Sequence, residues 1–132
     1  MSQADIETLR LGYEAMNRGD LDGALRAEHS DIEWKTADRH PIAGTYRGHD
    51  EVRRFFEDTR EAFEEVTVLP EEFIQCDDRI AVFVLMRSRP MDSSVAVEIR
   101  IAHLWTMRDG KAARCEVFPE RERALEAAGL RE

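Results

Sequence analysis

The chain has 132 residues, which fits one domain over residues 1–132 with a core of its own. Its 28 acidic residues outnumber 19 basic ones, and a body with a net charge of −9 repels a phosphate backbone, so we expect no nucleic-acid partner. The start is polar and acidic, and no apolar run approaches the roughly 20 residues that span a bilayer. We therefore expect a cytoplasmic protein without membrane contact.

The first part of the chain predicts two helices. Ser2 and Asp5 have the spacing of a capping box, and apolar residues then recur at helical spacing until Gly19. Asp20 is placed to cap a short second helix. The apolar positions of these two helices are Ile6, Leu9, Tyr13, Met16, Leu21, Ala24 and Leu25.

The next stretch combines a strand, a loop and the clearest helix. Ile32 and Trp34 alternate with charged residues, as in a half-buried strand. Residues 36–48 hold one proline and two glycines without any period, and they predict a loop. From Asp50 onward one face of a helix is mainly apolar: Val52, Phe55, Phe56, Thr59 and Phe63.

Residues beyond this helix have the pattern of strands. Residues 66–76 predict a strand interrupted at Pro70, because proline cannot donate to an interior ladder. Residues 80–86 form an almost continuous apolar run. Residues 95–107 alternate, and one face of that strand carries Val95, Val97, Ile99, Ile101, His103, Trp105 and Met107.

The pair Asp109-Gly110 is a strong hairpin signal, and it leads into a returning strand over residues 112–118. A last short helix over residues 120–128 ends at Gly129. Helices followed by antiparallel strands predict an α+β fold. We expect a cone-shaped, curved antiparallel sheet wrapped around three N-terminal helices, with a short C-terminal helix and room for a cavity.

Three segments resemble a known family. Residues 44–55 lead from a loop into a helix, residues 102–111 span a long strand and its hairpin, and residues 114–130 hold the closing strand and terminal helix. In this order they resemble SnoaL-like proteins of the nuclear transport factor two-like superfamily. The resemblance implies one apolar pocket, shared by polyketide cyclases, ketosteroid isomerases, dehydratases, epoxide hydrolases and non-catalytic proteins. The chemistry must therefore be argued from the site.

Several functions lose support on sequence grounds. Asp38 and His40 lie near the position of the catalytic Asp of ketosteroid isomerase-like enzymes, but the surrounding motif does not match, and we take both as loop residues at the pocket mouth. The residue patterns of the dehydratases and epoxide hydrolases are not visible. No phosphate loop, nucleophile elbow or zinc spacing is present, so we expect no cofactor and no metal. Cys76 and Cys115 should be free thiols.

His103 is the first candidate catalytic residue, because it interrupts an apolar strand face and imidazole titrates near neutral pH. Counting back from a regular two-residue turn places Glu116 opposite it. A Glu116 carboxylate there would orient the ring and raise the pKa of His103. The alternatives are a core histidine and an ion pair of Glu116 with Arg114 or Arg100.

Other candidates would wall the pocket. The Tyr13 hydroxyl either points into the cavity, where it would polarise a carbonyl group, or belongs to the core. Core packing explains the aromatic candidates equally well. The predicted substrate-binding residues are Trp34, Phe55, Phe83, Trp105, Arg114 and Phe118.

Two functional hypotheses follow. In the first, the protein is a cofactor-independent isomerase or cyclase that moves a proton on an apolar carbonyl substrate. In the second, it is a non-catalytic module for ligand binding or interaction. We also expect a homodimer, because the face that carries Ala102 and Leu104 is more apolar than a solvent-facing sheet needs, and the fold that it resembles often pairs through its sheet.

Overall fold

The computed structural model describes residues 2–36 and 44–129, and it contains four helices and six strands within those ranges. The elements in chain order are α1 (Ser2–Asn17), α2 (Leu21–Arg26), β1 (Glu28–Lys35), β2 (Thr45–Arg47), α3 (Gly48–Ala62), β3 (Phe63–Cys76), β4 (Arg79–Pro90), β5 (Val97–Arg108), β6 (Lys111–Phe118) and α4 (Arg121–Ala127).

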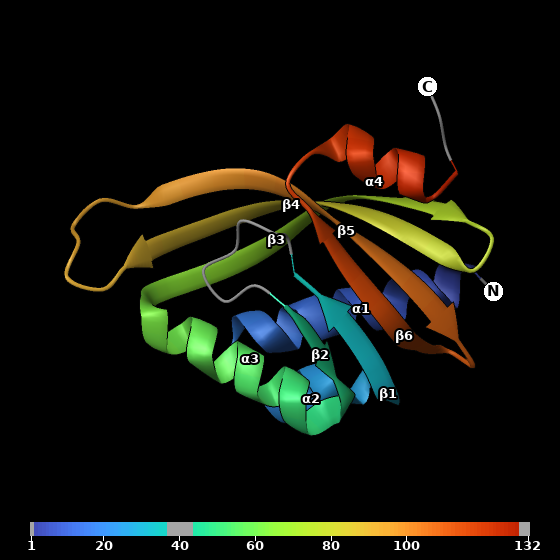
Figure 1. The fold of residues 1–132 in the computed structure, drawn as a ribbon, viewed down its shortest axis with the longest axis horizontal. Coiled ribbons are helices and arrows are strands. Elements are labelled where there is room, and N and C mark those ends of the chain that lie inside the picture. The colour runs from blue at the N-terminus through green and yellow to red at the C-terminus, as the bar shows by residue number, and fades with distance from the viewer. Residues whose placement is uncertain (1, 37–43, 130–132) are drawn as a thin grey trace.

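The strands form one curved sheet in the order β2-β1-β6-β5-β4-β3. Helices α1, α2 and α3 lie against one face, called here the inner face, and α4 lies against the other, outer face (Figure 1). This confirms the predicted α+β cone. One feature was not predicted: β1 and β6 pair in parallel, whereas the other neighbours are antiparallel. The parallel pair is possible because a long connection separates the two strands.

The predicted helix starts have clear local causes. The Asp20 carboxylate accepts a hydrogen bond from the Gly23 backbone N–H at 2.9 Å, which caps α2. At the start of α3, the Glu51 carboxylate accepts from the Arg47 backbone N–H at 2.8 Å. Phe55 and Phe56 of α3 are both buried, as their spacing predicted. The helix ends one residue earlier than its apolar stripe, because β3 starts at once.

The β5–β6 hairpin turns at the predicted pair. Asp109 and Gly110 both have positive φ, of 55° and 80°, as in the two-residue turn that suits the twist of a hairpin. A bulge then shifts the register: Met107 faces Ala112, but Thr106 faces Arg114. One residue of β6 therefore has no paired residue on β5.

The bulge overturns the predicted pairing of His103 with Glu116. His103 lies opposite Val117, and Glu116 lies opposite Leu104. Because side chains alternate along a strand, a shift of one residue sends Glu116 to the outer face while His103 stays on the inner face.

The outer face is apolar where α4 covers it. Ala124 packs with Ala102 and Phe83, and Ala128 packs with Leu104 and Ala81. The apolar face at Ala102 and Leu104 therefore has an intramolecular partner, and it gives no reason to expect a second chain there.

Two further expectations concern the whole described part of the chain. Cys76 and Cys115 are free thiols, as predicted. Within residues 2–36 and 44–129, no helix is both long enough and apolar enough to cross a membrane.

Candidate functional site

A cavity of about 450 Å³ lies between the inner face of the sheet and the helices. Its walls are almost entirely apolar and come from α1, α2, α3 and five of the strands. They include Met16, Trp34, Phe55, Phe56, Val68 and Ile101. A volume of this size matches pockets that hold small organic molecules.

Several polar side chains in the wall are already engaged by the backbone. Asn17 exchanges two hydrogen bonds with the backbone of Val68, at 2.7 and 2.8 Å. The Thr59 hydroxyl donates to the Phe55 carbonyl at 2.8 Å, and the Thr36 hydroxyl donates to the Gly44 carbonyl at 3.1 Å. These groups hold the wall together, so they are not the first candidates to bind a ligand.

His103 lies in this wall with Tyr13 behind it. The Tyr13 hydroxyl is 2.6 Å from His103 Nδ1, and the Trp105 indole N–H donates to the Tyr13 oxygen at 2.9 Å. An indole N–H only donates, so the Tyr13 oxygen accepts from Trp105. In the described part of the chain, the Tyr13 hydroxyl hydrogen has no acceptor other than His103 Nδ1, so the arrangement that satisfies it has Tyr13 donating to Nδ1. The neutral imidazole then carries its hydrogen on Nε2. Among the described residues, none accepts a hydrogen bond from Nε2.

Both members of the pair are neutral at ordinary pH. Burial lowers the pKa of His103 to about 4, and burial also raises the pKa of Tyr13 well above its usual value. The two rings lie nearly parallel, with centroids 5.7 Å apart, and Trp34 and Trp105 meet the imidazole edge-on. The expected rise in the pKa of His103 is therefore wrong, because its hydrogen-bond partner is a phenol rather than a carboxylate.

Glu116 does not orient His103. Its carboxylate lies on the outer face, 3.7 Å from Lys35 and 3.8 Å from Arg114, and Arg114 also pairs with Glu33 at 3.3 Å. The alternative considered from sequence, an ion pair with Arg114, is what the structure contains.

The remaining predicted residues fall into three places. Trp34 and Phe55 line the large cavity. Trp105 and Tyr13 lie behind His103, so the Tyr13 hydroxyl engages the imidazole instead of a ligand. Phe83, Phe118 and Arg114 belong to the outer face. The bulge moves Phe118 and Arg114 there as it moves Glu116, and Phe83 of β4 lies opposite Ala102 in a regular register. Asp38 and His40 lie outside the described residues.

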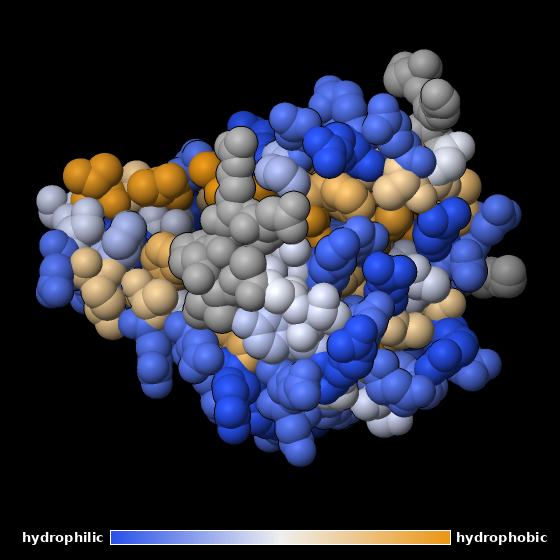
Figure 2. Space-filling view, viewed as in Figure 1, coloured by the Kyte–Doolittle hydropathy of each residue, from blue (hydrophilic) through white to orange (hydrophobic). Residues whose placement is uncertain are grey.

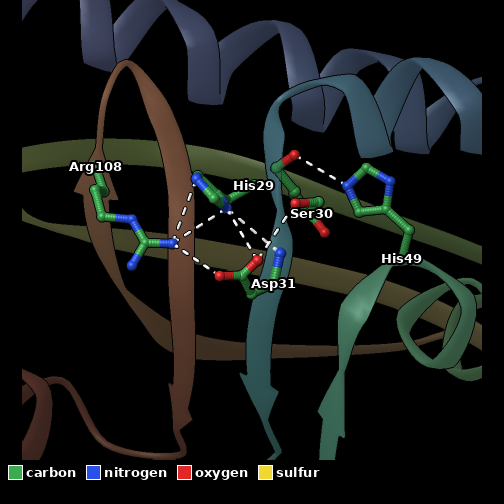
Figure 3. Close-up of polar contacts among 6 residues, drawn as sticks. His29, Ser30, Asp31, His49 and Arg108 are labelled. Carbon is green, nitrogen blue, oxygen red and sulfur yellow. Dashed lines mark hydrogen bonds and ion pairs between the residues drawn. The ribbon is translucent and has the colours of Figure 1, made fainter.

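Glu28 is a buried acid that sequence reasoning missed. Its side chain is 4% exposed, and burial raises its pKa to about 8. Its neighbours His29, Ser30 and Asp31 are polar, so nothing in the local pattern separates it from a surface residue. Ser30 and Asp31 are exposed, and Figure 3 shows Arg108 of β5 reaching to His29 and Asp31.

The arrangement offers a hydrogen-bond donor to a ligand and shows no candidate metal ligands. In the part of the chain that the structure describes, no three His, Cys, Asp or Glu side chains gather as a metal site would require. Besides Ser88 and Arg60, which also line the cavity, the wall presents the His103 Nε2–H, held by Tyr13 in an apolar setting. Such a donor fits the lone pairs of a carbonyl oxygen.

Comparisons with known proteins agree with this fold. The family model for the SnoaL-like domain matches residues 9–115. An uncharacterised protein of Mycobacterium tuberculosis is 31% identical over 118 residues, which cover 87% of this chain and 88% of that protein.

Two solved structures are similar over nearly the whole chain. TerC, co-crystallised with polyporic acid, is 27% identical with a TM-score of 0.82, covering 96% of this chain and 98% of TerC. A nuclear transport factor two-like protein of unknown function from Burkholderia pseudomallei is 29% identical with a TM-score of 0.81, covering 96% of both chains. The chain belongs to the SnoaL-like family.

Proposed function

We propose that the chain binds an apolar small molecule with a carbonyl group in the large cavity, and that His103 Nε2–H donates a hydrogen bond to the carbonyl oxygen. The observation that carries this proposal is an unengaged, orientated N–H group in an apolar cavity of about 450 Å³. TerC supports it, because that relative was co-crystallised with a small organic molecule, polyporic acid.

The reaction that such a site would assist is transfer of a proton from the carbon next to the carbonyl to a solvent base, water or hydroxide, because no carboxylate lines the cavity among the described residues. As the proton leaves, negative charge grows on the carbonyl oxygen, and a fixed N–H donor in a dry cavity stabilises that charge. Isomerisations and aldol-type cyclisations both pass through such an enolate. With a pKa of about 4, neutral His103 is a weak base at neutral pH, so its role here is that of donor.

Binding is tested with a matched pair of probes, methyl naphthyl ketone and ethylnaphthalene, which share their shape and differ in the carbonyl oxygen. We expect the ketone to bind about fivefold more tightly, as one net hydrogen bond gives. His103→Leu should remove this preference while ethylnaphthalene still binds. Equal affinities in the wild type, or an unchanged preference in the variant, would contradict the proposal.

The same ketone separates catalysis from simple binding. Its methyl protons lie next to the carbonyl, so enolisation in heavy water replaces them with deuterium, which proton NMR measures. Exchange above the buffer rate that is lost in His103→Leu would support proton transfer. Exchange at the buffer rate, with ketone binding intact, would favour the non-catalytic ligand-binding function, because the donor would then only hold the carbonyl.

We also propose a homodimer, on different grounds from those of the sequence. Met91, Val95, Val97 and Ile99 are large apolar residues with 43–65% of their surface exposed. Figure 2 shows orange atoms gathered at the end of the molecule where the β4–β5 connection lies in Figure 1. A second copy would cover this apolar arm.

Sedimentation equilibrium at micromolar concentration should give twice the mass of one chain, and Val95→Asp should lower the measured mass. A monomer mass would refute the dimer.

A further inference from the structure

A second, much smaller cavity of about 20 Å³ lies behind Tyr13. Its lining includes Glu28, Tyr13, Trp34 and Trp105, among apolar side chains. Two buried polar atoms of this lining, Glu28 Oε1 and Trp34 Nε1, have no hydrogen-bond partner among the described residues. Room for a water molecule begins at about 10–15 Å³, so this cavity fits one.

Glu28 is fixed in place by its own backbone. It begins β1, and its carbonyl oxygen accepts a hydrogen bond from His49 Nε2 at 3.0 Å. The ionisable groups around it are Tyr13 of α1, Cys115 of β6 and His49 of α3. Within the described residues, no cation pairs with its carboxylate. Because burial raises its pKa to about 8, the carboxyl group is protonated at neutral pH and carries an O–H donor.

We propose that one water molecule occupies the small cavity, accepts hydrogen bonds from the Glu28 carboxyl group and the Trp34 indole N–H, and donates one to the Tyr13 hydroxyl oxygen. The water then makes three hydrogen bonds, the usual number for a buried water. Tyr13 accepts from Trp105 and from the water, and it donates to His103, which uses its donor and both acceptor sites.

Glu28 is thereby a positioning residue for His103. A chain of hydrogen bonds, called here the line, runs from Glu28 through the water and Tyr13 to His103 Nδ1. The bond to Nδ1 keeps the ring hydrogen on Nε2, which faces the large cavity. When Glu28 ionises it can no longer donate, so the water turns its second O–H towards the carboxylate. The new negative charge then polarises the water and the Tyr13 hydroxyl that it contacts. The hydrogen bond between Tyr13 and His103 should change with it. This proposal rests on the proposed function in one respect only, namely that His103 Nε2–H binds a ligand.

The experiment follows the His103 ring in ligand-free protein labelled with ¹⁵N-histidine. In the wild type, the His103 ring signals should shift with a midpoint near pH 8, where Glu28 titrates. Glu28→Gln should remove that step. Glu33→Gln, on the same strand, is the matched control and should keep it, because the Glu33 carboxylate pairs with Arg47 at the surface. Signals that stay flat through this range in the wild type, or a step that persists in Glu28→Gln, would overturn the proposal.

A second variant keeps the test decisive if Glu28→Gln does not fold. Tyr13→Phe removes the hydroxyl that links the water to His103. The infrared carboxylic-acid band of Glu28 should still titrate in this variant, while the His103 signals lose the step. If the His103 signals still shift near pH 8 in Tyr13→Phe, the hydrogen-bond chain through Tyr13 is refuted. Because no ligand is present, failure here would leave the binding proposal untouched.

Discussion

The two halves of β5 have the same alternating pattern and different surroundings. On the inner face, Val97 and Ile99 are 43% and 44% exposed, whereas His103 and Trp105 are 4% and 5% exposed. Tyr13 packs against the second pair, and the first pair extends into the apolar arm. Alternation therefore shows which side chains share a face, but the helices decide which part of that face is core and which part is the open wall of a cavity.

The largest effect on stability should come from a residue buried between the helices and the sheet. Phe55 of α3 is buried against Trp34 and Phe56 beneath the sheet. Phe55→Ala should lower the free energy of unfolding by about 3–5 kcal/mol, from lost burial and the cavity left behind. Urea unfolding followed by circular dichroism measures this. A loss below about 1 kcal/mol would mean that the helix contributes little to the core.

An intermediate effect should come from acid. Burial lowers the pKa of His103 to about 4, so between that value and the ordinary pKa of about 6.5 the unfolded chain binds a proton that the folded chain does not. The stability that neutral His103 contributes is complete above about pH 6.5 and is lost as pH falls towards 4, about 3 kcal/mol in all.

His103→Gln isolates this contribution. The difference in unfolding free energy between wild type and variant should shrink as pH falls through that window, as measured by urea unfolding at several pH values. His29→Gln, which removes a half-buried histidine of β1, serves as the control. If the difference in unfolding free energy between wild type and His103→Gln is constant with pH, His103 is not held neutral by burial.

The smallest effect on stability should come from the open half. Ile99 lines the large cavity and is 44% exposed in the single chain, so Ile99→Thr should change the free energy of unfolding of the monomer by less than about 0.5 kcal/mol. The affinity for methyl naphthyl ketone should nevertheless fall, because an apolar wall group is lost. A large loss of stability would place the arm in the core and remove the contrast between the two halves of β5.

The elements and their order could be predicted from sequence because each has a local signal. The pair Asp109-Gly110 predicted the hairpin, and the spacing of Phe55 and Phe56 predicted a buried helix face. The bulge beside Thr106 was not predicted. Its trace in the sequence is that Arg114 and Glu116 face solvent in the shifted register, whereas they would face the cavity in the unshifted one. One unpaired residue was enough to remove Glu116 from the site.

The partner of His103 could not be found by local reasoning either. Tyr13 was recognised as a candidate, but its contact with His103 joins positions 90 residues apart, and only the packing of α1 on the sheet brings them together. Glu28 is the harder case, because an acidic residue among polar neighbours is normally exposed. Its burial depends on the parallel pairing of β1 with β6.

That parallel pairing also affects the order of folding during synthesis. Strand β1 leaves the ribosome early, yet its β6 partner is made about 80 residues later, and loops of that length are slow to close. Until then one edge of β1 offers unpaired N–H and C=O groups to other chains, which is the usual route to aggregation of a nascent sheet. A chaperone that shields this edge would act on residues 28–35. Chains that end before residue 111 would lack β6, and with it the strand pairing that buries Glu28.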